Sequence, residues 1–428
     1  MIGIFIGLAL MMYLAFKGFS IIWVAPFSAG IVALLGGLEV VEAVVGPFMS
    51  GFANFAQTWF PVFMLSSIFG KIMDDTGMAE SIAESIGKVI GKKHALLGVL
   101  IPTALLTYGG ISMFVVGFSV YPVALSLYRK ANLPRHLIPG VICLGNFTFT
   151  MTAFPGTPQI QNLIPISYFN TSPTAAPIVG LVAGTFMAVT GYFYLVWSQK
   201  KSVAKGNQFI EPKDKKVVTI DEDKKANVWW SLSPLVVILV TLNILNFRIE
   251  TSLLWGIAVA IAINLPKIKK IAPSVNEGAK GSMGAIVNTS AAVGFGTVVQ
   301  ATPAFATITE ILLSIPGSPL ISLAVSVNLL SGVTGSASGG LGISLGALAD
   351  GYLEIANQQG INPEVFHRIA SLASGGLDSL PHNGAIITLL AICGLTHKES
   401  YFDMFIVGVV IPMLSLIPAI TLATMGVV

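Results

Sequence analysis

Charged side chains are scarce in this chain of 428 residues, of which only 10% are Asp, Glu, Lys or Arg. Soluble domains carry charges on about a quarter of their residues. Hydrophobic residues make up 54% of the chain, and many gather in runs long enough to enter a bilayer. This composition excludes an ordinary soluble protein. It predicts an all-α polytopic membrane protein with the lipid bilayer as its solvent.

Cysteine is almost absent, and so are the motifs of several large protein classes. The two cysteines, Cys143 and Cys393, lie in apolar segments and indicate neither a disulfide framework nor a metal site. No phosphate-binding loop of the form G-x-x-x-x-G-K-[ST] is present, which argues against an ATP-driven pump. Acidic residues interrupt the lysine-rich stretch 200–225, which argues against nucleic-acid binding. We therefore expect no metal, cofactor or nucleic-acid partner.

One apolar stretch, residues 366–395, is broken at its centre. The break contains Gly375, Gly376, Asp378, Pro381, His382 and Asn383. Proline removes a backbone donor and glycine weakens a helix, so we expect two half-helices joined by unwound chain. Such backbone is tolerated in a membrane only where protein buries it or water reaches it, and it points to a transporter binding site. A kinked packing helix with a satisfied polar cluster is the alternative.

Three further interruptions are similar in character. Residues 137–165 form a second broken span, whose centre contains Asn146, Thr152, Gly156 and Thr157. Residues 95–128 and 319–353 are apolar but interrupted halfway. Residues 95–128 could form two short spans or one re-entrant hairpin, and we interpret each segment as a hairpin because this keeps the distribution of basic residues consistent. The hairpin tips are Tyr108, Gly109, Gly110 and Ser112 in the first, and Thr334, Gly335, Ser336 and Ser338 in the second.

The two halves of the chain follow the same order of elements. One offset of 226 residues (334 − 108 and 380 − 154) aligns both the hairpin tips and the broken spans. We expect two repeats of five transmembrane helices, and the odd number requires the second to be inverted in the membrane. The predicted domains are the first inverted repeat (1–197), a cytoplasmic linker (198–228) and the second inverted repeat (229–428). Amphipathic stretches at 79–90 and 305–315 predict one interfacial helix in each half.

Basic residues are distributed unevenly between the predicted loops. If the linker is cytoplasmic, 21 of the 23 lysines and arginines lie on the cytoplasmic side, and only Arg248 and Arg368 lie outside. This bias is typical of membrane proteins with a fixed orientation. It supports ten crossings with both termini outside, and it leaves no basic side chain at membrane depth.

The four interruptions are expected to converge on one site. Because its side chains are almost all neutral, a bound anion must rely on half-helix N-termini, with their free backbone N–H groups and dipoles. The candidate substrate-binding residues are Tyr108, Gly109, Gly110, Ser112, Asn146, Thr152, Gly156, Thr157, Thr334, Gly335, Ser336, Ser338, His382 and Asn383. Glycine-rich tips also arise from close helix packing, which is the alternative explanation for them.

Asp378 is the one carboxylate that we expect deep in the membrane. Because burial disfavours the ionised form of a carboxyl group, Asp378 is the candidate proton-coupling residue. His382, four residues on, is the candidate to share that proton, and a packed neutral histidine explains it equally well. A carboxylate beside unwound carbonyl groups also suits sodium, and a helix-capping role is the structural alternative for Asp378.

With these residues in view, the chain resembles the gluconate:proton symporter (GntP) family. The stretch ASGGLDSLPHNGAIITLLAICGLTHKESYFDM is similar to its D-β-hydroxybutyrate permease branch. The resemblance implies a proton symporter that imports a small hydroxy-monocarboxylate, such as 3-hydroxybutyrate, across a bacterial cytoplasmic (inner) membrane. It also implies a homodimer and an elevator-type mechanism with a moving transport domain. A sodium-coupled carboxylate transporter and a gluconate-type sugar-acid permease are the alternatives.

A channel and a membrane enzyme are the rival functional classes. Two opposed hairpins and paired broken helices indicate an occluded site rather than an open pore. An enzyme would need a nucleophile–base pair or a metal cluster, and Asp378 with His382 lacks an obvious third group. We therefore predict a transporter and not an enzyme.

Overall fold

Helices account for all regular secondary structure in the residues that the computed structural model describes, which confirms the predicted all-α class. The described residues are 2–17, 19–111, 113–212, 227–265, 271–305, 307, 318–381 and 383–428. The first half contains α1 (Ile2–Phe16), α2 (Ile21–Gly36), α3 (Val40–Ala43), α4 (Met49–Asp75), α5 (Met78–Ile90), α6 (Ala95–Tyr108), α7 (Met113–Lys130), α8 (Ile138–Phe147), α9 (Ile160–Phe169) and α10 (Pro177–Ala204). The second half contains α11 (Val228–Asn243), α12 (Ile249–Ile263), α13 (Ile271–Ala301), α15 (Pro319–Thr334), α16 (Ala337–Gln359), α17 (Pro363–Ser374), α18 (Gly384–Ile392), α19 (His397–Phe405) and α20 (Ile411–Thr424). Short π-helical turns lie at Val44–Phe48, Phe149–Ala153 and Ile406–Val410, and 3₁₀ turns lie at Lys92–His94 and Arg135–Leu137.

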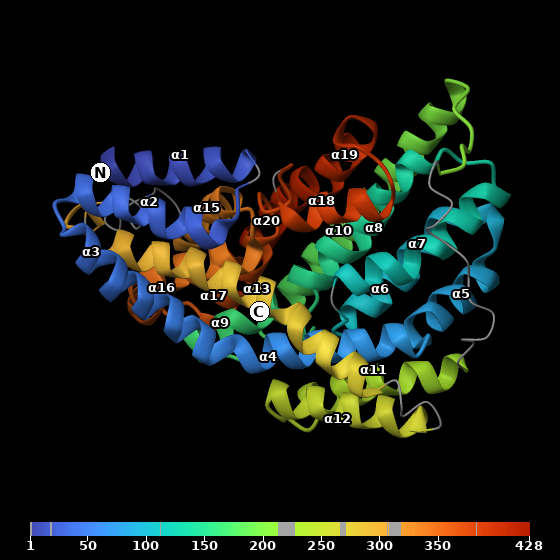
Figure 1. Cartoon of the computed structure of the whole chain (residues 1–428), viewed down its shortest axis with the longest axis horizontal. Coiled ribbons are helices and arrows are strands. Elements are labelled where there is room, and N and C mark those ends of the chain that lie inside the picture. Colours follow the sequence, from blue (N-terminus) through green and yellow to red (C-terminus); the bar gives the residue numbers. More distant parts are fainter. Residues whose placement is uncertain are drawn as a thin grey trace.

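Two long helices, α4 and α13, pack along each other and cross the middle of the molecule (Figure 1). Their close approach depends on small residues, because a Cβ atom on Gly278 would lie only 2.6 Å from the Cα atom of Ile68. α2 packs against α13 through a separate apolar cluster that includes Val24, Ala25 and Phe295, and α1 packs against α2. Small residues at crossings are typical of membrane proteins, where packing rather than water exclusion drives helix association.

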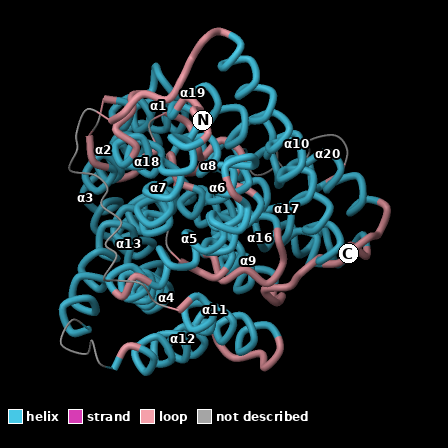
Figure 2. The backbone as a smooth tube through the Cα atoms, turned by 90° about the vertical axis from the view of Figure 1, so that its right-hand side faces the viewer, coloured by secondary structure: helices cyan, strands magenta, loops and turns pink. Residues whose placement is uncertain are grey.

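The other helices surround this pair. Figure 2 shows α11 and α12 as a pair at the edge of the bundle, where α12 contacts α4 and α11 contacts α5. The predicted interfacial helix at 79–90 is α5, and it bends by 101° into the following helix, Lys92–Tyr108. Its apolar face is buried against α6, α7 and α11, so protein covers the surface that we expected lipid to cover. The second such helix, predicted at 305–315, falls almost wholly outside the described residues.

Few helices of the described chain could cross a bilayer unbroken. Three are long and apolar enough: α10, α13 and the continuous segment His397–Thr424, which joins α19 and α20 through a π turn. A fourth appears if the bent pair of α5 and α6 is counted as one span. The ten crossings and the inverted orientation of the two halves stay predictions.

Helix pairs occupy both segments for which we predicted hairpins. α6 and α7 are joined by a turn that begins at Gly109, and α15 and α16 by Gly335 and Ser336. Gly110 and Gly335 have φ angles of 89° and 59°, which other residues rarely adopt. The starts of α7 and α16 are 224 residues apart (337 − 113), and so are the starts of α9 and α18 (384 − 160). This spacing is two residues shorter than the predicted offset of 226, and the repeat stays a prediction.

Both predicted breaks interrupt their helices. In the first break, residues 148–159, α8 gives way to a π turn and then to Pro155 and Gly156 before α9 begins. In the second break, residues 375–383, α17 ends and α18 begins after Asn383. The Asn383 Oδ1 atom caps α18 by accepting hydrogen bonds from the N–H groups of Ala385 (2.6 Å) and Ile386 (3.2 Å). The alternative in which Asp378 caps this helix is therefore wrong.

Candidate functional site

The two breaks and the two hairpin turns meet in the interior of the molecule. A Cβ atom on Gly110 in the first turn would lie 2.8 Å from Cγ of Pro158 in the first break. A Cβ atom on Gly332, near the second turn, would lie 2.8 Å from Cβ of Leu377 in the second break. The breaks also contact each other, since a Cβ atom on Gly375 in the second break would lie 2.9 Å from Cγ2 of Thr152 in the first. The four interruptions thus converge as the sequence predicts.

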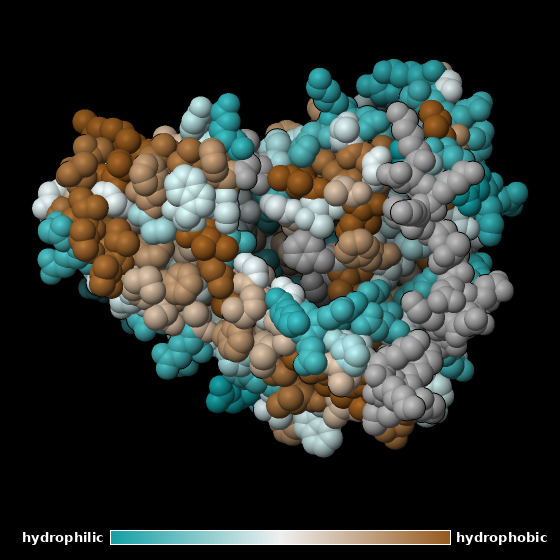
Figure 3. All heavy atoms as spheres, in the orientation of Figure 1, coloured by the Kyte–Doolittle hydropathy of each residue, from teal (hydrophilic) through white to brown (hydrophobic). Residues whose placement is uncertain are grey.

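A cavity of about 490 Å³ lies among these elements. Figure 3 shows the molecular surface hollowed near its centre. The cavity is lined by both hairpins, both breaks, α4, α13 and the segment before α2, and its size suits a small organic ligand. Its polar lining residues are Ser20, Ser66, Ser67, Gln159, Gln161, Ser282, Asn288, Thr289, Thr334, Ser336, Ser338, Asp378 and Asn383. Asp378 is the one charged residue in the described lining.

Four helices begin at the wall of this cavity. Met113 of α7, Ile160 of α9, Ala337 of α16 and Gly384 of α18 are the first residues of their helices, and all four line the cavity. The first backbone N–H groups of a helix have no partner within it, and the helix dipole adds partial positive charge there. At α16 and α18 the capping side chains of Ser336 and Asn383 accept from some of these groups. The cavity therefore suits an anionic group, although its described lining has no basic side chain.

Asp378 lies at the cavity wall with only 3% of its surface exposed. Its Oδ1 atom accepts a hydrogen bond from Ser379 Oγ at 3.0 Å, and its backbone carbonyl accepts one from Asn383 Nδ2 at 2.8 Å. No ion pair to Asp378 is present among the described side chains. A buried carboxylate without a cation is costly, so a proton or a bound cation is expected to compensate its charge.

The structure divides the predicted site residues into two groups. Those that line the cavity are Gly110, Thr334, Gly335, Ser336, Ser338, Asp378 and Asn383. Those that lie behind its wall are Tyr108, Gly109, Asn146, Thr152, Gly156 and Thr157. The Tyr108 hydroxyl donates to the carbonyl of Pro155 at 2.8 Å, so it supports the first break. Ser112 and His382 lie outside the described residues.

Several polar lining residues were not predicted, and most belong to α4, α13 and the start of α9. They are Ser20, Ser66, Ser67, Gln159, Gln161, Ser282, Asn288 and Thr289. On α13, small and polar residues recur every three or four positions at Ser282, Ala285, Thr289 and Ala292, all of which line the cavity. That spacing on one helix face, inside a mostly apolar helix, is the signal that identifies this wall from sequence.

Arg368 corrects the expectation that no basic side chain lies in the interior. It sits in the second turn of α17 and has no exposed surface. The sequence prediction began the broken span at residue 366 and assigned Arg368 to the outer side. The helix in fact begins at Pro363, which carries Arg368 into the protein.

Four buried side-chain oxygen atoms near the breaks have no hydrogen-bond partner in the described structure. They are Thr157 Oγ1, Gln161 Oε1, Asn328 Oδ1 and Ser331 Oγ. Buried polar atoms are ordinarily satisfied, and hard cations take oxygen ligands of this kind. The described residues contain no cluster of three or more His, Cys, Asp or Glu side chains that could hold a metal ion. These oxygens are free to accept a hydrogen bond from a ligand or to contact a cation.

The sequence is similar to those of known membrane transporters. Residues 11–278 match the family model of the citrate transporters, CitMHS. The chain belongs to this family. The uncharacterized transporter YxjC of Bacillus subtilis is 38% identical to it over 452 residues, which cover 96% of each chain. A transporter of Haemophilus influenzae, also named uncharacterized, is 24% identical over 177 residues, covering 41% of this chain and 40% of its own. As a CitMHS member, the protein is a membrane transporter and not an enzyme.

The match to CitMHS shows that the inferred resemblance to the GntP family is wrong. The motif behind that inference spans residues 373–404, beyond the matched residues 11–278. Glycine, proline and asparagine at a break serve the backbone geometry of any broken transporter helix. The motif therefore carries information about the fold rather than about the family.

The crystal structure of the YdaH transporter from Alcanivorax borkumensis has a similar architecture. The TM-score is 0.58, and the alignment covers 90% of this chain and 88% of that chain at 12% sequence identity. At this identity the likeness concerns the fold, which is that of a helical membrane transporter.

Proposed function

We propose that this CitMHS member is a secondary active transporter that imports a small hydroxy-monocarboxylate, such as 3-hydroxybutyrate, together with a proton. The observation that carries the proposal is the cavity itself. Four helix N-termini reach it, while its described lining has one acid and no basic side chain. The helix N-termini bind the substrate carboxylate. The side chains of Ser336, Ser338 and Asn383 bind its hydroxyl group.

In this proposal Asp378 carries the coupled proton. An ionised Asp378 repels a carboxylate in the same cavity, and the repulsion is strong where the dielectric constant is low. A protonated Asp378 does not repel the carboxylate, so the proton binds before the substrate and both are released together.

His382, outside the described residues, is the neighbouring candidate to share the proton. Sodium is the alternative ion, supported by the free oxygens of Asn328 and Ser331.

Citrate is the second candidate substrate, because the family model describes citrate transporters. Its three carboxylates would repel one another and Asp378, and no basic side chain in the described lining offsets that repulsion. Citrate would therefore cross with its charge compensated, either by protons or by a bound divalent cation that travels as part of the substrate.

We also propose an elevator-type mechanism in a homodimer of the bacterial cytoplasmic (inner) membrane. The hairpins and broken helices form the moving transport domain, and α4 and α13 belong to the scaffold and dimer interface. Two features support this division. α4 and α13 form an extensive contact with each other, and the cavity lies between them and the breaks, with Ser66 and Ser67 on one side and Thr334 and Asn383 on the other.

Transport by purified protein in proteoliposomes tests the proposal. Uptake of labelled 3-hydroxybutyrate under a pH gradient, a sodium gradient or neither identifies the coupling ion. Labelled citrate with and without magnesium tests the second candidate. Counterflow separates a carrier from a channel, because only a carrier exchanges labelled substrate without net flux. The proposal is refuted if neither carboxylate is taken up faster than by protein-free liposomes.

A further inference from the structure

We propose that Arg368 is a positioning residue of the transport site: it holds the start of α9 at the cavity wall without lining the cavity. The inference rests on the proposed function, because the start of α9 is one of the four N-termini assigned to the carboxylate. It follows from a chain of hydrogen bonds that runs from α17, in the second half of the sequence, to the first break.

Arg368 is a buried cation whose described hydrogen-bond partners are neutral oxygens. Its Nε and Nη2 atoms donate to the carbonyl of Ala175 at 3.0 and 2.7 Å, and Nη1 donates to Asn162 Oδ1 at 2.8 Å. A guanidinium group binds several acceptors in a fixed planar fork, which a lysine cannot reproduce. Because a buried cation is costly unless its donors are satisfied, these oxygens are held in fixed positions.

Asn162 connects this cation to the cavity wall. Its Oδ1 atom accepts from Arg368, and its Nδ2 atom donates to the carbonyls of Thr157 at 2.9 Å and Pro173 at 2.8 Å. Thr157 directly precedes the residues at which α9 begins and which line the cavity, 158–161. Fixing Asn162 therefore fixes the orientation of the α9 N-terminus.

The same face of α17 also holds the loop that follows α9. Glu364 and His367 lie four and one positions before Arg368, a spacing that places all three side chains on one side of the helix. Glu364 Oε2 accepts from the N–H of Ala176 at 2.9 Å, and His367 Nδ1 lies 2.6 Å from Thr171 Oγ1. α9 is thus fixed at both ends by α17.

α10 provides the space that this arrangement needs. A Cβ atom on Gly180 would lie 3.1 Å from Nε of Arg368 and 2.6 Å from the carbonyl oxygen of Ala153. Any larger residue at this position would displace the guanidinium group or the first break. The three elements around Arg368 are therefore closely fitted to one another.

The test compares Arg368→Lys with Arg248→Lys in proteoliposomes. Lysine keeps the positive charge but loses the fork, so the KM for carboxylate uptake is expected to rise about tenfold in Arg368→Lys, with a smaller change in maximal counterflow rate. Arg248 is the matched control because it is exposed and pairs with Glu250, two residues along. If Arg368→Lys fails to fold, Asn162→Asp replaces it, since aspartate keeps the acceptor for Arg368 but loses both donated bonds. An unchanged KM in a folded variant overturns the inference.

A second readout needs no transport and separates this inference from the proposed function. Ile160→Cys places a thiol at the first residue of α9, on the cavity wall, while both native cysteines are buried. Its labelling rate with a membrane-impermeant thiol reagent is expected to change several-fold when Arg368→Lys is added. An unchanged rate overturns the positioning role even if the protein transports neither carboxylate.

Discussion

The two breaks face one cavity but are built from different chemistry. The first break is neutral, and amide side chains hold it from behind: Asn162 Nδ2 donates to Thr157 O and Asn243 Nδ2 to Gly156 O, both at 2.9 Å. The second break carries the acid Asp378 and the capping residue Asn383. The first break can bind an anion at any pH because it has no acidic side chain. The second break can do so only when a proton or a cation neutralises Asp378. We infer that both breaks bind the substrate and that only the second couples it to the ion.

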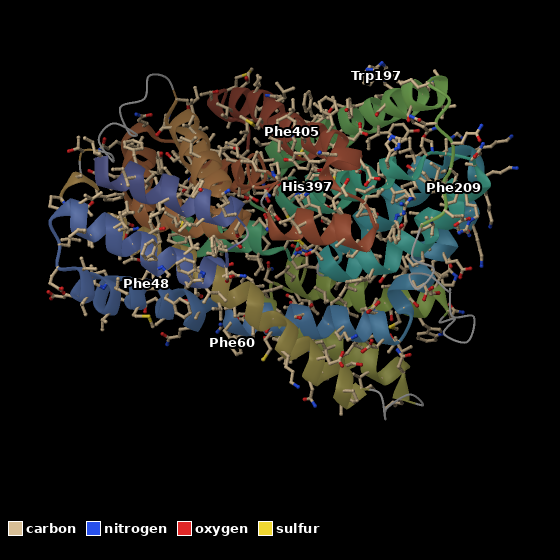
Figure 4. All side chains as sticks on the ribbon, turned by 45° about the horizontal axis from the view of Figure 1, so that its top comes forward. Phe48, Phe60, Trp197, Phe209, His397 and Phe405 are labelled. Carbon is tan, nitrogen blue, oxygen red and sulfur yellow. The ribbon has the colours of Figure 1, made fainter. Side chains whose placement is uncertain are left out.

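The two breaks also differ in what supports them. Behind the first lies the fully buried cation Arg368. The second is held by α19, where the Tyr401 hydroxyl donates to Ser379 O at 2.9 Å and His397 Nε2 lies 2.9 Å from Pro381 O. His397, labelled in Figure 4, is exposed at the start of α19. The hydrogen bonds that hold the break with the acid therefore extend to the surface of the protein, whereas the support of the first break is buried.

The largest effect is expected from Asp378→Asn, which makes the second break as neutral as the first. One coupled proton in a gradient of about one pH unit supports about tenfold accumulation, since one unit corresponds to about 1.4 kcal/mol. The variant should only equilibrate the substrate, while counterflow continues. Asp350→Asn, at an exposed acid of α16, is the control and should accumulate normally. Accumulation by Asp378→Asn driven by pH would contradict the division of roles.

Asn383 and Gln159 directly precede α18 and α9, the helices that follow the two breaks. Replacing each with alanine should lower substrate affinity in both variants but lower folding stability by different amounts. Asn383→Ala removes the cap of α18, which costs about 1 kcal/mol of folding stability, and lowers substrate affinity. Gln159 makes no capping bond to α9, but its Nε2 donates to Thr107 O at 2.6 Å. Gln159→Ala removes two hydrogen bonds, whereas Asn383→Ala removes two capping bonds and the bond to the Asp378 carbonyl. Gln159→Ala should therefore lower affinity with a smaller loss of thermal stability. Equal thermal midpoints for both variants would argue against the assigned cap.

A smaller effect is expected when the support of the second break is weakened. Tyr401→Phe removes one hydrogen bond to Ser379 O, worth about 1 kcal/mol, and should reduce pH-driven uptake a few-fold. The exchange rate without a gradient should change less, because the first break is untouched. Tyr13→Phe, at an exposed tyrosine of α1, controls for the loss of a hydroxyl group. A loss of exchange as large as the loss of driven uptake would mean that Tyr401 supports binding.

The smallest effect is expected far from both breaks, at the end of α7. Arg129 Nε pairs with Glu211 Oε1 at 2.6 Å, and the guanidinium group lies over the ring of Phe209, labelled in Figure 4. Exposed ion pairs contribute about 0–1 kcal/mol. Arg129→Gln should lower the thermal midpoint slightly, less so at high salt, and leave KM unchanged. A change in KM would show that the linker affects the site.

The breaks and turns could be predicted from the sequence because glycine and proline act locally on the backbone. Residues 375–383 and the turn at Gly335 fall where these residues cluster. Which side chains face the cavity depends on the rotation of packed helices, which local patterns do not fix. Tyr108 therefore turns to Pro155, while Ser66 and Thr289 on the long helices reach the cavity.

Two other predictions were wrong because of the boundaries chosen for a segment. Beginning the broken span at residue 366 removed Arg368 from the interior, although α17 starts at Pro363 with Asn362 as its cap. A motif of about thirty residues around one break suggested the wrong family, while the matched family covers residues 11–278. In both cases the prediction relied on one short segment and did not take the flanking sequence into account.

Simultaneous recording of substrate and proton uptake shows directly whether Asp378 carries the coupled proton. Proteoliposomes containing a pH-sensitive dye receive the labelled carboxylate that the wild type transports, and the two fluxes are compared with those of Asp378→Asn. We expect that carboxylate uptake acidifies the interior in the wild type and that the variant exchanges carboxylate without proton movement. Proton uptake that persists in the variant, or wild-type uptake that follows sodium with no proton flux, would contradict it.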